Sequence, residues 1–265
     1  LSSGLDTTSV ITQLMAAESA PQNQLKAQVV TTNTVVSALQ GLNSRLANLA
    51  DAAATAAKAG SLDLYSASSS STAASASVAT GAAAGTLQVV VSALATPQVG
   101  VSAAMTTWPA PPTITIVGHS GSSLEITPAS NSLDDIAAAI NGSAAGVTAT
   151  KVASGSDGSG NRLYRLQFSS TATGANASFT IYQGSAADVA GGTATNVMTA
   201  PGSAVITTAQ DASVTLWKGT SAEQVITSST NRFTDLLPGV TVTASAVSAD
   251  PVTITVARDD ARISA

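Results

Sequence analysis

One long helical pattern constrains the fold of this chain more than any other feature. Between residues 25 and 53, apolar positions recur in eight steps that cover 28 residues, a mean spacing of 3.5. That spacing is the period of a coiled-coil seam, in which one face of a helix packs against a partner helix. A single helix cannot bury such a face by itself, so the sequence predicts a partner helix. The seam consists of Leu25, Val29, Thr32, Val36, Leu39, Leu42, Leu46, Leu49 and Ala53.

The helical pattern extends in both directions and predicts helix over residues 5–60. Asp6 and Thr7 are candidate caps at its start. Pro21 is expected to interrupt the helix or to begin a second one, and Gly60 is expected to end it. No second long helical pattern follows in the sequence. The partner helix is therefore expected from another subunit or from sequence beyond the last residue of the chain.

The composition excludes several functional classes. Charged residues make up 9% of the 265 residues, against about 25% in an average soluble domain, so the surface must be largely neutral. The net charge of −5 and the ten scattered Lys and Arg residues give no basic stripe for nucleic acid. There is no cysteine, hence no disulfide or thiolate metal site. No transmembrane span and no cleavable secretory signal are expected, and a start at Leu1 indicates a trimmed chain.

After the helix, some 200 residues show mainly the alternating pattern of β-strands. Residues 66–85 are low in complexity and fit either a linker or an edge strand. Residues 107–112, rich in Pro, predict a joint, and residues 184–204 predict a loop. The expected strands are 86–95, 113–118, 123–127, 146–153, 162–170, 177–183, 212–217, 223–229, 239–247 and 251–257.

One short helix is expected within the β-rich part, over residues 132–141. Ser132 and Asp135 have the spacing of a capping box, in which the side chain of each residue bonds the backbone N–H of the other. Asp134 lies beside Asp135, but consecutive helical residues point about 100° apart, so the two carboxylates do not converge. The acidic pair is therefore interpreted as a helix start rather than as a catalytic or metal-binding pair.

No arrangement of residues in the sequence indicates catalysis. His119 is the sole histidine, it falls in an expected hairpin turn, and any Ser–His–Asp triad would have to use it. Residues 154–161 have the Gly and Asp content of a weak calcium loop, but they lack the spacing of an EF-hand and are better explained as a turn. We therefore expect no catalytic, cofactor-binding or metal-binding residue, no cofactor and no enzymatic activity.

Several motifs, in order, resemble one known family. "SGLDTTSVITQLMAAESAPQNQL" at residues 3–25 resembles the start of flagellar hook-associated protein 2, the filament cap protein. The segments "TITIVG", "NSLDDIAAAIN", "GVTATKV" and "RLYRLQFSSTATGANASFTI" resemble the flagellin hook IN motif, named for an Ile-Asn pair that is here Ile140–Asn141. The resemblance covers nearly the whole chain.

This resemblance implies a fold of the α+β class: a helical stalk of coiled-coil type, followed by two mainly antiparallel β-rich domains, the second inserted in the first. The implied domains are the stalk at 1–65, an inner β-rich domain at 66–106 and 205–265, and an inserted domain at 107–204. The natural partner of the seam is then a C-terminal helical arm, so the chain is expected to be truncated at Ala265.

The resemblance also implies a function without catalysis. Cap proteins are exported unfolded without a cleaved signal, form a homo-oligomer described as a pentamer at the filament tip, and help flagellin to fold and insert. In some bacteria they also touch host glycans or mucin. The residues that would pack the stalk are Leu25, Val29, Val36, Leu39, Leu42, Leu46 and Leu49. The alternatives are a flagellin or hook–filament junction protein, a surface adhesin and, last, a hydrolase that depends on His119.

Overall fold

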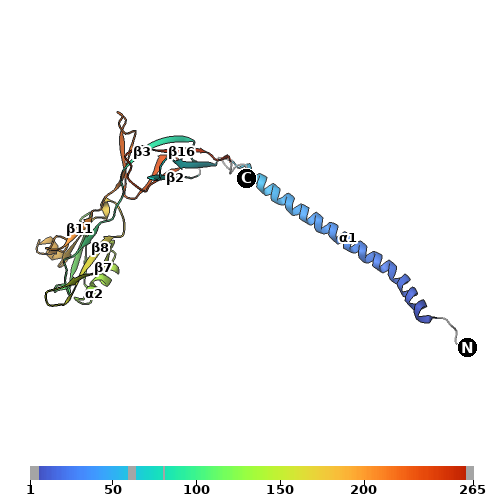
Figure 1. The fold of residues 1–265 in the computed structure, drawn as a ribbon, viewed down its shortest axis with the longest axis horizontal. Coiled ribbons are helices and arrows are strands. Elements are labelled where there is room, and N and C mark those ends of the chain that lie inside the picture. Colours follow the sequence, from blue (N-terminus) through green and yellow to red (C-terminus); the bar gives the residue numbers. More distant parts are fainter. Residues whose placement is uncertain (1–5, 59–63, 80, 261–265) are drawn as a thin grey trace. The chain divides into compact units, whose positions relative to one another are not determined.

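The structure is a computed structural model that describes residues 6–58, 64–79 and 81–260, and the chain divides into two compact units, residues 1–62 and 63–265. The first unit consists of one long helix, α1, spanning Thr7–Ala56 (Figure 1). Asp6 is its N-terminal cap, because one carboxylate oxygen accepts a hydrogen bond from the backbone N–H of Ser9 at 3.1 Å. Of the two candidate caps, Asp6 is therefore confirmed, whereas Thr7 is the first helical residue.

The expected interruption at Pro21 is wrong, because α1 continues through it. A proline inside a helix removes one backbone hydrogen bond and costs about 3 kcal/mol. The surrounding segments are rich in Ala, Leu and Gln, which favour helix, and they continue it on both sides. The helix also ends earlier than expected, at Ala56, where the Ala57 N–H donates to the Ala53 carbonyl at 2.9 Å. Gly60, the expected stop, lies outside the described residues.

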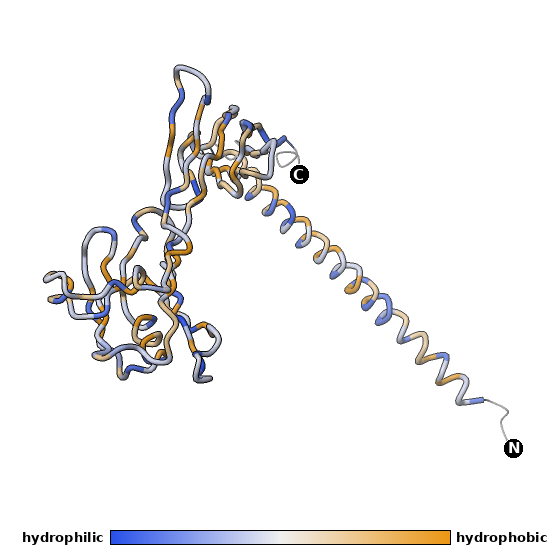
Figure 2. Tube along the Cα trace, turned by 60° about the vertical axis from the view of Figure 1, so that its left-hand side comes forward, coloured by the Kyte–Doolittle hydropathy of each residue, from blue (hydrophilic) through white to orange (hydrophobic). Residues whose placement is uncertain are grey.

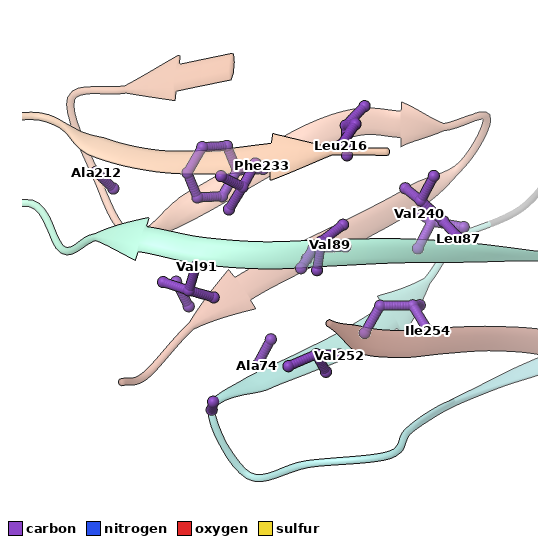
Figure 3. Close-up of a cluster of buried hydrophobic side chains, with 14 of the residues drawn as sticks. Ala74, Leu87, Val89, Val91, Ala212, Leu216, Phe233, Val240, Val252 and Ile254 are labelled. Atoms are coloured by element: carbon purple, nitrogen blue, oxygen red, sulfur yellow. The ribbon is translucent and has the colours of Figure 1, made fainter. Parts of the chain in front are cut away.

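The second unit begins with two antiparallel sheets that enclose one hydrophobic core (Figure 3). Both sheets combine strands from the two ends of the unit, so residues more than 160 positions apart in sequence pair directly, such as Val240 with Val78 and Val252 with Val89. The five-stranded sheet has the order β1 (Tyr65–Ser69), β16 (Val252–Arg258), β3 (Gly85–Ala93), β12 (Ala212–Leu216) and β13 (Gln224–Ser228). The three-stranded sheet has the order β14 (Arg232–Leu237), β15 (Val240–Ala244) and β2 (Ala74–Val78).

Alternation of Val or Ile with Thr explains these strands. In β16, Val252, Ile254 and Val256 are buried, whereas the Thr residues between them are half-buried. β-Branched side chains favour the extended backbone and pack well on a pleated face. The segment 66–85, for which a linker or an edge strand was expected, contains most of β1, the whole of β2 and the start of β3. β1 and β2 lie at sheet edges, which supports the edge-strand alternative.

A second hydrophobic core lies between residues 105 and 198 of the same unit. It is built from two further antiparallel sheets and from α2 (Leu133–Asn141), which packs along β7 (Figure 1). One sheet has the order β10 (Thr195–Asn196), β9 (Phe179–Gln183), β5 (Ile114–Gly118) and β6 (Ser123–Ile126). The other has the order β11 (Ala204–Thr207), β4 (Val99–Val101), β8 (Arg162–Ser170) and β7 (Val147–Ser156).

The loop expected at 184–204 is partly wrong. It contains the short helix α3 (Ala186–Ala190) and strand β10, and β11 begins at its end. Ser185 and Asp188 form a complete capping box at the start of α3, a signal that the Gly-, Ala- and Thr-rich composition concealed. The short 3₁₀ helix Ala175–Ala177 was also not anticipated, and β9 begins two residues later than expected. The α+β class, with a long N-terminal helix and antiparallel sheets, is confirmed.

Hydrogen bonds of the backbone and of short polar side chains connect the two cores. The N–H of Thr96 donates to the carbonyl of Gln210 at 3.0 Å, between the segment leaving β3 and the segment leading into β12. Asp211 accepts a bond from the N–H of Ala175 at 2.8 Å, and the Thr173 hydroxyl donates to the Ser229 carbonyl at 2.7 Å. The segment after β8 is therefore tied to both ends of the β12–β13 hairpin. The expected domain boundaries at 106/107 and 204/205 stay a prediction.

Candidate functional site: the exposed seam of α1

The predicted seam lies exposed on α1. No residue of this helix is buried, and apolar positions recur along its length (Figure 2). Leu25 is 61% exposed, Leu42 62% and Val36 45%. Burial of one such side chain contributes about 1.5–3 kcal/mol, so the seam leaves on the order of 10 kcal/mol of hydrophobic stabilisation unrealised. The exposed seam residues are Leu25, Val29, Val36, Leu39, Leu42, Leu46 and Leu49.

The spacing of the seam contains one irregularity. A regular coiled coil alternates steps of three and four residues. Here the steps Val36 to Leu39 and Leu39 to Leu42 are both three, and Asn43 occupies the position that a regular repeat would make apolar. A shift of this kind, called a stammer, locally overwinds a coiled coil. A partner helix must therefore match a seam whose apolar line shifts around the helix near residue 40.

A second exposed apolar group precedes the seam on the same helix. Val10, Ile11, Leu14 and Met15 are all more than half exposed. α1 carries only Glu18, Lys26, Arg45 and Asp51 as charged residues over its 50 positions. Electrostatic pairing therefore contributes little to partner choice along α1, and apolar packing is the main interaction that this surface offers.

The two carboxylates at the start of α2, those of Asp134 and Asp135, contact different partners, as expected for consecutive residues of a helix. The Ser132 hydroxyl accepts a hydrogen bond from the N–H of Asp135 at 3.1 Å, which is one half of the expected capping box. The other half differs, because the Asp135 carboxylate accepts from the Ser130 hydroxyl, whose oxygen accepts from the Ser132 N–H at 3.0 Å. Asp134 instead forms a salt bridge with Lys151 at 2.5 Å. Both carboxylates serve the helix and its contact with β7.

His119 has one side-chain partner. Its Nδ1 lies 3.0 Å from the hydroxyl oxygen of Ser178. In the described part of the chain, no carboxylate hydrogen-bonds to His119, so the hydroxyl and the imidazole lack the third member of a triad. His119 itself is exposed in the turn between β5 and β6, where the sequence placed it.

The Gly- and Asp-rich segment 154–161 closes the β7–β8 hairpin around one carboxylate. Asp157 accepts bonds from the N–H groups of Ser159 and Asn161 at 2.9 and 2.8 Å, and from the side-chain amide of Asn161 at 2.9 Å. These bonds, the Asn161 side-chain amide first, lower the pKa of Asp157 below its ordinary value of 3.8. Both carboxylate oxygens are thus occupied by N–H donors, which supports the turn over the calcium loop. Among the described residues, no cluster of three His, Asp or Glu side chains could hold a metal ion.

Trp108 was not recognised from the sequence as a core residue. It lies in the Pro-rich joint expected at 107–112, but its side chain is 2% exposed and belongs to the second core. Trp217, by contrast, is about half exposed in the β12–β13 turn with a φ of +50°. Trp217 ends the alternating segment 212–217, in which it falls on the face opposite to Val214 and Leu216, whereas Trp108 lies outside any periodic segment, so no sequence signal indicated the burial of Trp108. Within the described residues, α1 included, no helix is long and apolar enough to cross a membrane.

Comparison with family models gives two matches. Residues 3–98 match the model described as flagellar hook-associated protein 2 N-terminus, and residues 113–172 match the flagellin hook IN motif. Together they cover α1, the first strands of the inner core and the α2–β7–β8 region. Comparison with curated protein sequences gives no match.

Solved structures give further matches. The structure of the D1–D2–D3 domains of the flagellar cap protein FliD from Escherichia coli matches with a TM-score of 0.64 and 27% identity, over 86% of this chain. The D2–D3 domains from the same organism match with 0.58 and 28%, over 74% of this chain and all of the other. FliD (HAP2) from Pseudomonas aeruginosa PAO1 matches with 0.51 and 26%, over 73% of this chain and 88% of the other.

These matches, the long exposed helix and the antiparallel sheets define a protein of the bacterial flagellum. In residues 3–98 the chain matches flagellar hook-associated protein 2, and its fold is similar to that of solved flagellar cap proteins, as the order of its motifs indicated. It spans 64% of the E. coli D1–D2–D3 chain.

Proposed function

We propose that this chain is part of a flagellar filament cap subunit, a structural protein that assembles at the filament tip outside the cell. The observation that carries the proposal is its match to the E. coli cap protein over 86% of its length. The exposed seam of α1 supports it, because an assembly subunit is the kind of protein in which partner chains bury such a face. The role includes promoting the folding and insertion of flagellin, with export that needs no cleaved signal.

The seam is the proposed packing surface of a helical stalk. Its partner is an apolar helix, either from a C-terminal arm of the same protein or from another subunit of a homo-oligomer. Residues Leu39, Leu42 and Leu46 surround the irregular step and are the positions at which a mismatched partner would pack worst. The two β cores correspond to the proposed inner domain, 66–106 with 205–265, and the inserted domain, 107–204.

Two details refine that domain division. β4 and β11 pair with each other and share a sheet with β8, which supports assigning residues 99–101 and 204–207 to the proposed inserted domain. The crossing between the domains would then lie at the Thr96–Gln210 bridge. No contact among the described residues favours host glycans, mucin or nucleic acid as partners, so adhesion is not part of the proposal.

The proposal is tested in cells that lack the native gene. The complete protein is returned with Leu39, Leu42 and Leu46 changed to Asn, which removes three apolar groups from the seam. We expect this seam variant to give short or absent filaments and loss of flagellin monomers to the medium. Electron microscopy measures the filaments, and immunoblotting measures the released flagellin.

The matched control, the opposite-face variant, changes Ser37, Gln40 and Ser44 to Asn. At 100° per residue, these three positions lie on the side of α1 that faces away from the seam. The variant carries the same number of Asn residues over the same turns of the helix and should restore normal filaments. Equal defects in the two variants would indicate loss of the helix rather than loss of the seam.

Immunogold labelling locates the protein independently of those variants. Label at filament tips is expected. Label along the shaft would instead indicate a flagellin, and label at the hook boundary a junction protein. Normal filament growth in cells without the protein would contradict the proposal.

A further inference from the structure

The side-chain amide of Asn141 holds the end of α2 to β7. Its nitrogen donates a hydrogen bond to the carbonyl of Ala149 at 2.9 Å, and its oxygen accepts one from the Ala149 N–H at 2.7 Å. β7 is the last strand of its sheet, so these two bonds satisfy main-chain groups at an open edge. The preceding residue, Ile140, is fully buried in the second core. The end of α2 is therefore held by apolar packing and by the two bonds to Ala149, here called the Asn141 clasp.

The residue after Asn141 makes that amide chemically reactive. Asn141–Gly142 is the only Asn–Gly pair among the 265 residues. Glycine has no Cβ to hinder its main-chain nitrogen, which can attack the side-chain carbonyl carbon of the preceding asparagine. A new C–N bond closes a five-membered succinimide ring, the attacking nitrogen loses its proton, and the side-chain amide leaves as ammonia. Water then opens the ring to aspartate or isoaspartate, so the overall reaction consumes water, releases ammonia and involves no oxidation.

The folded structure holds both reacting groups away from this reaction. The N–H of Gly142 donates to the carbonyl of Ala138 at 2.9 Å, so its nitrogen is bound to the end of α2. The Asn141 clasp fixes the side chain towards β7. Asn141 is exposed, so exclusion of water is not what protects it. Attack on the side chain therefore requires that the end of α2 opens and that the clasp breaks.

We propose that Asn141 is a modification site whose reaction is controlled by folding. The chain deamidates at this residue when it is unfolded or when the end of α2 opens, and the folded chain is protected. The product no longer supports the clasp. An aspartate carboxylate has no N–H to donate, so it places an oxygen against the Ala149 carbonyl oxygen, and isoaspartate also lengthens the main chain. The inference does not depend on the cap role, because it rests only on the Asn141 clasp and on the glycine that follows it.

The first test measures the rate of deamidation. The protein is incubated in native buffer and, at the same pH and temperature, in guanidinium chloride, and mass spectrometry of the peptide that contains residue 141 gives the modified fraction. We expect the rate in denaturant to be at least about ten-fold higher, because opening of a packed helix end limits the reaction in the folded chain. Gly142→Ala, which adds a Cβ, should slow the reaction in denaturant. Equal rates in native buffer and in denaturant overturn the proposal.

Helix caps identify the opening that controls the reaction. Ser132→Ala removes the N-terminal cap of α2 and should speed deamidation in native buffer about three- to ten-fold, as expected for the loss of one cap. The matched control, Ser185→Ala, removes the cap of α3 and should leave the rate unchanged. Equal rates in these two variants would mean that α2 does not control the reaction, and would overturn the proposal.

The variant Asn141→Asp supplies the reaction product directly. Its melting temperature at neutral pH should fall by roughly 2–12 °C, because one hydrogen bond is lost and two oxygens face each other across the clasp. The matched control, Asn176→Asp, changes an exposed asparagine outside the clasp and should melt within about a degree of the original protein. An equal fall in the two variants, or no fall for Asn141→Asp, overturns the proposed consequence of deamidation.

Discussion

At the residue scale, Gly174 is a position where the backbone tolerates little change. It has φ +95° and ψ 158°, a region that is essentially open only to glycine. A Cβ there would lie 2.7 Å from the Ser229 Cβ and 2.8 Å from the Asp211 Oδ1, against the hairpin that ties the two cores together. We expect Gly174→Ala to destabilise the β-rich unit by about 2–3 kcal/mol. The melting temperature, followed by circular dichroism, should fall by roughly 4–12 °C.

The matched control for that change is Gly158→Ala in the β7–β8 turn. No heavy atom lies within 4 Å of the added Cβ, and φ is outside the left-handed region. Its melting temperature should stay within about a degree or rise slightly, because alanine restricts the unfolded chain. An equal fall in melting temperature in the two variants would show that backbone strain and steric contact at Gly174 do not cause the destabilisation.

Asp157 gives a pH-dependent prediction. Its folded pKa is lowered, first by the Asn161 side-chain amide, so the bonds to its carboxylate stabilise the fold above the unfolded value of 3.8. That contribution is lost as the pH falls through the folded pKa, which is lower still. Asp157→Asn places an amide against the Asn161 amide and should lower the melting temperature at neutral pH. The difference from the native protein should shrink towards pH of about 2, and a constant difference would contradict the assignment.

Single residues also show how far local sequence predicts geometry. The spacing of Ser132 and Asp135 predicted a helix start, and Ser132 does cap α2. The involvement of Ser130, which separates the Asp135 carboxylate from the Ser132 N–H, depends on how the preceding turn folds. A capping-box pattern contains no information about that turn. The burial of Trp108 is equally a product of tertiary packing, since its neighbours in sequence are prolines and threonines.

At the element scale, α1 shows that a proline need not end a helix. Pro21 removes one internal hydrogen bond, so Pro21→Ala should stabilise the helix locally by up to about 3 kcal/mol. Amide hydrogen exchange of the residues around position 21 should slow accordingly. Thr34→Ala, also exposed on α1, should slow exchange much less, because the propensity difference is only about 0.5 kcal/mol. Equal slowing of exchange in the two variants would indicate that Pro21 does not reduce the stability of the helix.

The strands that were predicted share a property that the missed ones lack. β12, β15 and β16 alternate an apolar residue (Ala, Val, Ile or Leu) with Ser or Thr over five residues, so their pattern can be recognised without knowledge of the partner strands. β4 has only three residues, Val-Gly-Val, and exists because β8 and β11 pair with it across the sheet. β1 and β2 consist mostly of Ser and Ala, and their pairing with β16 and β15 supplies what their propensity does not.

At the scale of the whole molecule, the order of motifs predicted the family, whereas the seam predicted only that a partner exists. A repeat of apolar residues specifies the need for burial and the period of the partner. It does not specify whether that partner is an arm of the same chain or a second subunit. The position of the inserted β-rich segment was likewise implied by the family resemblance. Local sequence patterns do not predict it, because the pairing of β3 with both β12 and β16 joins residues far apart in sequence.

The seam itself makes the last prediction. In a solution of this chain alone, the exposed apolar face should drive association between α1 helices, because about 1.5–3 kcal/mol is gained for each Leu or Val removed from water. Sedimentation velocity should then show a mass that rises with protein concentration. The seam variant, with Leu39, Leu42 and Leu46 changed to Asn, should keep a single-chain mass, and the opposite-face variant should associate like the original. A single-chain mass for the original protein at every concentration would mean that its seam requires a different helix, and that association through identical helices is wrong.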